Sequence, residues 1–229
     1  RAGPPPPLGF EERANRIPTG TDQIRIDKYS QPGAPDRFEV YLGGTIDTSP
    51  VAGGEPWDMT SNLAAIAGGT AGSLAATKRA MALAGIDSTT PVVFNGYSQG
   101  GLLSAELAAS GDYNTRGLFT LGGPGGQVSV PHDVPYVALE HADDLVPARG
   151  GVWKSSDPLL VTRTVYSDHA YSGDLFFPAH ELSNYQDTAR LADSTDERRL
   201  AAARDSLRRF SSGTARVQTS YFHAVRTQQ

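Results

Sequence analysis

The chain has 229 residues, with 20 lysine and arginine residues against 25 aspartate and glutamate residues, a formal net charge of −5. This length suits one domain with a substantial core. The acidic balance excludes nucleic acid as the expected partner, because its backbone requires clustered basic residues. The sequence contains no cysteine, which excludes disulfides, thiolate metal sites and cysteine nucleophiles. No apolar run approaches the roughly 18 residues of a membrane-spanning helix, so we expect no membrane span.

The first 20 residues are predicted to form a proline-rich leader, followed by a single domain over residues 21–229. Four consecutive prolines at residues 4–7 favour an extended, poorly packed segment. One or two helical turns are expected over residues 10–16. Because the sequence begins with Arg1 rather than methionine, we expect either a processed form or a piece of a longer protein.

Two strands are expected next, over residues 23–29 and 37–42. The segment between them, residues 31–36, is rich in turn-forming residues and predicts an antiparallel hairpin at the edge of a sheet. The second strand alternates less clearly than the first, as expected for a strand that lies deeper in a sheet. Residues 57–85 are predicted to be mostly helical.

Strands and helices alternate along the rest of the chain, which predicts a mostly parallel central sheet with helices on both faces. The segment 217–225 is predicted to be either a last strand or a tail. The remaining expected strands cover residues 91–95, 118–121, 134–140 and 159–166, and the remaining expected helices cover residues 99–109, 182–191 and 197–210.

A candidate nucleophile lies in the segment Gly96-Tyr97-Ser98-Gln99-Gly100, between a short apolar strand and a helix rich in alanine and leucine. In that context Gly-x-Ser-x-Gly indicates a nucleophile elbow, a sharp turn that presents the serine hydroxyl above the sheet edge. Glycines at positions 96 and 100 avoid collisions with the neighbouring strand and helix. The alternative interpretation is a glycine-rich turn with an incidental serine at Ser98.

A serine nucleophile needs a base, usually histidine, and a carboxylate that orients the base. In this fold type the chain order is serine, acid, histidine. The predicted strand 134–140 runs directly into Asp143 and Asp144. We predict Asp144 as the orienting acid and keep Asp143 as the alternative.

The base is predicted among the histidines that follow the acid in the chain. His180 opens the helix predicted at residues 182–191 and lies in a Pro-x-His-x-x-x-x-Tyr segment, which makes it the favoured base. His169, just after the predicted strand 159–166, is the alternative. Chain order disfavours His132 and His141.

Stabilising the oxyanion requires two preorganised N–H donors. The backbone of Gln99, directly after the candidate nucleophile, is one predicted donor. The other is expected from the loop after residues 37–42, where Gly43 and Gly44 precede Thr45, and we predict the backbone N–H of Thr45. The alternative is that the two glycines only form a tight turn.

Together these segments resemble the α/β-hydrolase superfamily over residues 23–193. The resemblance rests on the segment from Gly96 to Gly100, on Asp144-Leu145-Val146-Pro147 and on His180, in the order of the family. It implies an α/β-hydrolase-like three-layer sandwich. It also implies a serine hydrolase that cleaves carboxylic esters through a Ser-His-Asp triad and an acyl-enzyme, with no cofactor or metal ion.

The Gly-Gly-Thr strand end and the loop Gly122-Gly123-Pro124-Gly125 are similar to bacterial α/β-hydrolase domains, some of which belong to larger secreted or surface proteins. Only residues 122–133 connect two predicted strands where many family members insert a lid, so we expect no lid domain. The open site suits a small-molecule or lipid-like ester, and Tyr97, Phe176 and Phe177 are predicted to bind it. The alternative functions are acyltransferase or thioesterase activity on the same triad, or a non-catalytic interaction module.

Overall fold

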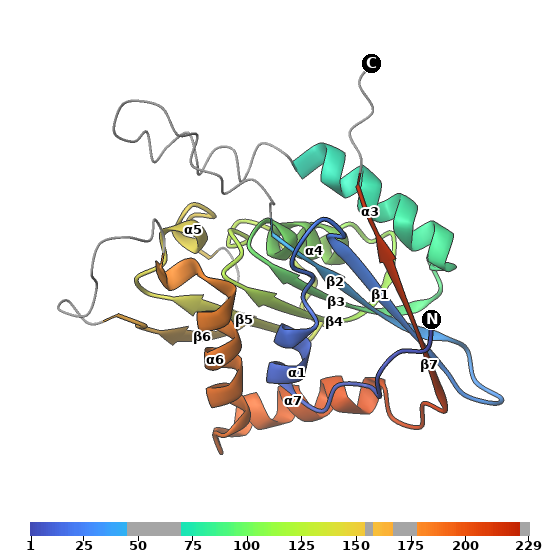
Figure 1. Ribbon diagram of the computed structural model, residues 1–229. Coiled ribbons are helices and arrows are strands. Elements are labelled where there is room, and N and C mark those ends of the chain that lie inside the picture. The colour runs from blue at the N-terminus through green and yellow to red at the C-terminus, as the bar shows by residue number, and fades with distance from the viewer. Residues whose placement is uncertain (45–69, 154–157, 167–177, 225–229) are drawn as a thin grey trace.

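The computed structural model describes residues 1–44, 70–153, 158–166 and 178–224. Within these ranges seven strands form one mixed sheet in the order β6-β5-β4-β3-β2-β1-β7 (Figure 1). Neighbouring strands from β2 to β6 run parallel, whereas β1 pairs antiparallel with both β2 and β7. The predicted mostly parallel α/β sheet is therefore confirmed.

The strands are β1 (Ile24–Ser30), β2 (Arg37–Leu42), β3 (Pro91–Tyr97), β4 (Asn114–Leu121), β5 (Tyr136–His141), β6 (Leu159–Arg163) and β7 (Arg216–Phe222). The helices are α1 (Phe10–Asn15), α3 (Thr70–Ala84), α4 (Gln99–Ala109), α5 (Leu145–Ala148), α6 (Leu182–Asp193) and α7 (Arg198–Phe210), with a 3₁₀ turn, η1 (Pro178–His180). No helix in the described ranges is long and apolar enough to cross a membrane.

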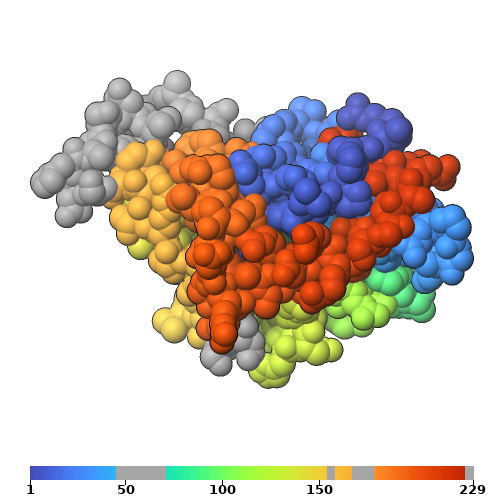
Figure 2. All heavy atoms as spheres, turned by 90° about the horizontal axis from the view of Figure 1, so that it is seen from below, coloured from blue at the N-terminus to red at the C-terminus, as the bar shows by residue number. Residues whose placement is uncertain are grey.

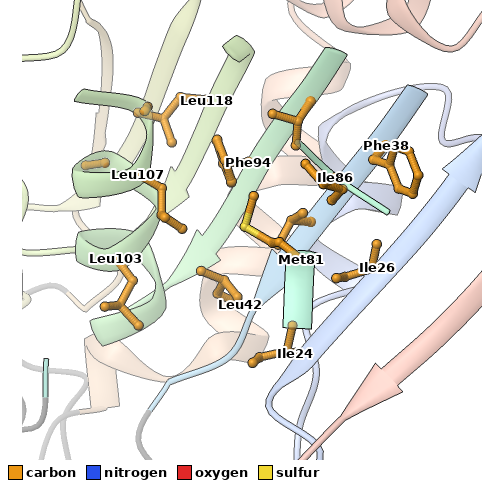
Figure 3. Packing of buried hydrophobic residues seen from close by; sticks show 14 of the residues in the cluster. Ile24, Ile26, Phe38, Leu42, Met81, Ile86, Phe94, Leu103, Leu107 and Leu118 are labelled. Atoms are coloured by element: carbon orange, nitrogen blue, oxygen red, sulfur yellow. The ribbon is translucent and has the colours of Figure 1, made fainter. Parts of the chain in front are cut away.

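Helices cover both faces of the sheet, an arrangement compatible with a three-layer sandwich (Figure 1). Helices α3 and α4 pack on one face, where Met81, Phe94 and Leu103 point toward one another (Figure 3). Helices α1, α6 and α7 cover the other face, and Figure 2 shows α1 in blue beside α6 and α7 in orange and red. Phe10 and Tyr185 are buried on this second face. Because both faces are covered, the interior residues of central strands such as β3 are buried throughout rather than alternating between buried and exposed.

The edge of the sheet differs from the sequence prediction. The β1–β2 hairpin forms with the expected antiparallel pairing, but it does not lie at the edge, because β7 pairs along the whole length of β1. Within the segment predicted as a strand or a tail at 217–225, residues 217–222 therefore belong to strand β7. Val217 and Thr219 are its buried positions, so its alternating pattern suits a strand with one covered face.

The N-terminal residues, predicted as a poorly packed leader, pair in part with the sheet. Ala2 forms a bridge with Gln218, and the backbone N–H of Gly3 donates to Val217 O at 3.0 Å. An edge strand exposes unpaired backbone groups, and the extended N-terminus satisfies part of β7. The expected short helix is α1, and Phe10 lies fully buried with its ring centroid 5.3 Å from that of Phe119.

The connection between β4 and β5, residues 122–135, contains no helix or strand, so no lid domain is inserted there. Of the helix predicted at residues 57–85, the structure describes the part from residue 70 onward, which forms α3. Residues 57–69 lie outside the described ranges.

Candidate active site

Ser98 occupies a strained turn between β3 and α4. Its backbone has φ 56° and ψ −123°, and it is the one non-glycine residue with positive φ in the described part of the chain. Such strain persists only where the surroundings enforce it. Here the N–H of Ser98 donates to Leu121 O at 2.9 Å, which joins the turn to the end of β4. A serine with positive φ between a strand and a helix is the backbone geometry expected for the predicted nucleophile elbow.

The two glycines of the motif have a steric explanation. A Cβ on Gly96 would lie 2.1 Å from the carbonyl oxygen of Gly100, and a Cβ on Gly100 would lie 2.3 Å from the carbonyl oxygen of Leu42. Backbone cannot move aside as a flexible side chain can, so any larger residue would displace α4 from β2 and β3. The glycines therefore allow the helix to begin directly behind Ser98.

His180 joins Ser98 to Asp144 through its two ring nitrogens. Its Nε2 lies 2.8 Å from Ser98 Oγ, and its Nδ1 lies 2.7 Å from Asp144 Oδ2. Because a carboxylate accepts only, a neutral His180 ring in this position carries its proton on Nδ1 and presents the lone pair of Nε2 to the serine hydroxyl. Figure 1 shows α5 and the start of α6 at the same edge of the sheet, which brings the segments flanking Asp144 and His180 together.

Asp144 is held by contacts on both carboxylate oxygens. It is the N-cap of α5, where Oδ1 accepts the N–H of Val146 at 2.9 Å. Oδ2 accepts the hydroxyl of Tyr185 at 2.6 Å as well as the N–H of His180. The side chain is fully buried, so these donors replace water around the charge. Asp144 therefore caps α5 with Oδ1 and faces His180 with Oδ2.

The alternative acid, Asp143, faces a different part of the chain. Its carboxylate accepts the backbone N–H groups of Val165 and Tyr166 at 3.1 and 2.8 Å. Burial disfavours the charged form of Asp143, but these N–H groups outweigh it and hold its pKa below the usual value. Asp143 thus ties the end of β5 to the segment that follows β6, while Asp144 faces His180.

His141 lies near the site without contacting Ser98. Its Nδ1 is 2.6 Å from Ala179 O and its Nε2 is 2.7 Å from Thr188 Oγ1, while its ring stacks on Tyr185 with centroids 3.8 Å apart. Burial lowers the pKa of His141, which favours a neutral ring. The other candidate base, His169, lies outside the described residues.

Three consecutive carbonyl groups of η1 are each bonded by a side chain from elsewhere. Pro178 O accepts from Asn184 Nδ2 at 2.8 Å, Ala179 O from His141 Nδ1, and His180 O from the hydroxyl of Tyr97 at 2.6 Å. We call these three side chains the carbonyl clamp. They come from α6, β5 and β3, so the backbone of His180 is fixed to three separate elements.

Tyr97 lies against His180. Its ring stacks on the imidazole with centroids 5.2 Å apart, in addition to the hydrogen bond to His180 O. Burial raises the pKa of Tyr97, so its hydroxyl remains a donor at neutral pH. The structure shows Tyr97 in contact with the histidine, and its predicted contact with substrate stays a prediction. Phe176 and Phe177, predicted to bind substrate with it, lie outside the described residues.

Of the two predicted oxyanion donors, the structure describes Gln99 but not Thr45. Gln99 is the first residue of α4, where backbone N–H groups have no partner within the helix and the helix dipole favours negative charge. A Cβ on Gly44 would lie 3.3 Å from Ser98 Cβ, so the backbone after β2 passes directly beside the nucleophile candidate. Thr45, the next residue, lies outside the described part of the chain.

Tyr185, Asn184 and His141 are the contacts that sequence reasoning missed. The one available signal was the tyrosine of the Pro-x-His-x-x-x-x-Tyr segment, which is Tyr185. The described residues contain no group of three or more His, Cys, Asp or Glu side chains that could hold a metal ion.

Comparison of the chain with models of known protein families and with curated proteins finds no match to either. The functional argument therefore rests on the geometry of the site.

Proposed function

We propose that this protein is a serine hydrolase of the α/β-hydrolase type that cleaves carboxylic esters. The observation that carries the proposal is the position of His180, hydrogen-bonded to Ser98 on one side and to Asp144 on the other. The same three residue types in the same bonded order activate serine on several unrelated folds. The positive φ of Ser98 between a strand and a helix is a second, independent feature of such sites.

In the proposed mechanism, Ser98 Oγ attacks the ester carbonyl carbon while His180 Nε2 takes the hydroxyl proton. Asp144 holds the ring with Nδ1 protonated and stabilises the imidazolium that forms. The carbonyl oxygen becomes an oxyanion, which accepts hydrogen bonds from the backbone N–H groups of Gln99 and Thr45. Each such donor contributes roughly 10²–10³ in rate when it is placed for the transition state.

The tetrahedral intermediate then breaks the bond to the alcohol oxygen, and His180 gives its proton to the departing alcohol. The acyl group remains on Ser98 as an ester. Water next attacks this acyl-enzyme, losing its proton to His180, and the carboxylic acid leaves as Ser98 regains a proton.

A fluorophosphonate probe tests the proposal, because it reacts with activated serines. We expect the folded protein to be labelled at Ser98, and labelling to disappear in Ser98→Ala and after heat denaturation. Ser104→Ala is the matched control, since Ser104 is also buried and lies on α4 but its hydroxyl donates to Gly100 O. A folded protein that takes up no probe at any serine contradicts the proposal.

A panel of esters and thioesters of increasing acyl length defines the reaction further. Because the connection at residues 122–135 carries no inserted lid domain, we expect the highest kcat/KM for short acyl groups. Adding an alcohol acceptor separates hydrolysis from acyl transfer, since a transferase forms a new ester in place of the free acid.

A further inference from the structure

Tyr185 is linked to the site through its hydroxyl group. The hydroxyl donates to Asp144 Oδ2 at 2.6 Å and lies 3.2 Å from the backbone N of His141, whose N–H donates to it. Asp144 Oδ2 is also the oxygen that accepts from His180 Nδ1 at 2.7 Å. One carboxylate oxygen therefore accepts from both the base candidate and the tyrosine, and the two hydrogen bonds compete for the same negative charge.

The tyrosine is held in place by its surroundings. Its side chain is fully buried, with its ring stacked on His141 at 8° between the ring planes. A Cβ on Gly122 would lie 2.7 Å from the hydroxyl end of the tyrosine ring, and Gly122 has φ +59°. Glycine at the end of β4 therefore leaves the space that the tyrosine tip occupies.

The hydroxyl of Tyr185 keeps its proton at neutral pH. Burial, and then the nearby charge of Asp144, raise the pKa of Tyr185 far above its ordinary value. A protonated hydroxyl is a donor, and donation to a carboxylate is a strong, charge-assisted hydrogen bond.

We propose that Tyr185 is a positioning residue of the hydrolase site, which orients Asp144 and draws negative charge away from the hydrogen bond between Asp144 and His180. This inference rests on the proposed function, because it concerns the same histidine. The tyrosine touches neither substrate nor Ser98 in this role. It acts through Asp144 and sets the pH at which His180 becomes free to accept the serine proton.

The direction in which the acidic limb of the pH profile moves follows from the negative charge that Asp144 presents to His180. Without the hydroxyl, Asp144 Oδ2 has a single donor and presents more negative charge to His180, which favours the imidazolium. The histidine then holds its proton to higher pH, and the acidic limb of the kcat/KM profile moves upward. Other ionisable groups that face these side chains are His141 and Glu140 on β5, Tyr97 on β3, and Glu181 before α6, and all of them remain in place.

The experiment is Tyr185→Phe, which keeps the ring and its stacking and removes only the hydroxyl. We expect kcat/KM to fall roughly tenfold, mainly in kcat, since a hydrogen bond to a charged group is lost. We also expect the acidic limb of the pH profile to shift upward by about half a unit or more. A folded variant with an unshifted limb overturns the inference, because loss of packing alone lowers activity without moving it.

Tyr41→Phe is the matched control. Tyr41 is likewise a fully buried tyrosine whose hydroxyl donates to a buried carboxylate, that of Glu39, but it lies on β2 away from His180. Its variant should lose stability in the same way as Tyr185→Phe and keep the wild-type pH profile. An equal shift in both variants assigns the effect to general destabilisation and overturns the inference.

A second measurement covers the case in which Tyr185→Phe does not fold. Protein with 3-fluorotyrosine incorporated at position 185 alone retains every ring and hydroxyl, and the more acidic hydroxyl at that position donates more strongly, so the acidic limb should move to lower pH. An unmoved limb overturns the inference. Failure of the proposed function looks different, since the wild-type protein would then show neither ester hydrolysis nor fluorophosphonate labelling, and both proposals would fall together.

Discussion

Asp144 and Asp143 are adjacent in the chain but face different partners. Asp144 accepts from His180, Tyr185 and Val146, whereas Asp143 accepts only backbone N–H groups among the hydrogen bonds described above. Both residues follow β5, which ends at His141; Asp143 lies in the turn after it and Asp144 is the N-cap of α5. The pair therefore offers a matched comparison of one carboxylate inside the site with one beside it.

We expect Asp144→Asn to lower kcat by roughly 10³–10⁴-fold, since an amide facing Nδ1 favours the tautomer with the proton on Nε2. That tautomer cannot accept the proton of Ser98. Asp143→Asn should retain most of the activity and lose stability instead. Steady-state kinetics on a short-chain ester distinguishes the two, and comparable losses of kcat in both variants would contradict the assignment of Asp144.

His141 predicts a pH dependence of stability. Burial lowers its pKa in the folded protein, so the unfolded chain binds a proton at higher pH than the folded one does. Stability from this group is then fully present above the unfolded pKa of about 6.5 and is lost as the pH falls below it. Urea unfolding at pH 7.5 and pH 5.5 should show this loss, and His141→Gln should have a smaller difference between the two pH values. If the loss of stability between the two pH values is as large in His141→Gln as in the wild type, groups other than His141 cause it.

At the scale of single elements, the packing of α4 against β2 and β3 depends on glycine. We expect Gly100→Ala to lower the free energy of unfolding by about 3 kcal/mol or more, because the added methyl meets backbone at 2.3 Å. Gly72→Ala is the control, for which we expect the free energy of unfolding to change in the opposite direction. Gly72 lies within α3 with no atom within 4 Å of an added Cβ, and alanine there should raise stability by up to about 1 kcal/mol. Denaturant titration measures both, and a well-tolerated Gly100→Ala would contradict the steric argument.

The 3₁₀ turn η1 shows how tertiary contacts replace regular structure. Three residues cannot hold their own conformation, because a short turn makes few internal hydrogen bonds. The carbonyl clamp supplies what is missing, with Asn184, His141 and Tyr97 bonding consecutive carbonyl groups. The position of His180 therefore depends on β3, β5 and α6 together.

For the whole molecule, the N-terminal segment stabilises the face of the sheet that carries α6. Phe10 is fully buried against Phe119, and α1 contacts α6 directly. Arg13 on α1 is also fully buried and forms an ion pair with Glu39 of β2 at 2.9 Å. The N-terminal residues thus belong to the packed body of the protein.

We expect Phe10→Ala to lower the free energy of unfolding by about 3–5 kcal/mol, the usual cost of truncating a buried phenylalanine. Leu8→Ala, two residues earlier, is the control, because Leu8 is 64% exposed and such changes stay within about 0.5 kcal/mol. Thermal and urea unfolding of the two variants measures the difference. Similar stability of the two would show that α1 is only loosely attached.

The sequence by itself determined most of the local structure and the order of the candidate site. Apolar runs and turn residues located β1 to β5 and the helices α4, α6 and α7, because these signals act over a few neighbouring residues. The glycine-flanked Ser98 after a strand was also readable, since the elbow is a local motif. The end of β6 was placed three residues too far, at Tyr166 instead of Arg163, since strand ends depend on the partner strand.

Only the tertiary structure decided the contacts between distant segments. It placed β7 rather than β1 at the edge, paired the N-terminal residues with β7, and turned Asp144 rather than Asp143 toward His180. It also brought Tyr185 to Asp144 and His141 to Ala179. The physical reason is that a hydrogen bond tolerates only a few tenths of an ångström. Side chains from β3, β5 and α6 reach that precision only after the whole sheet and its covering helices have packed.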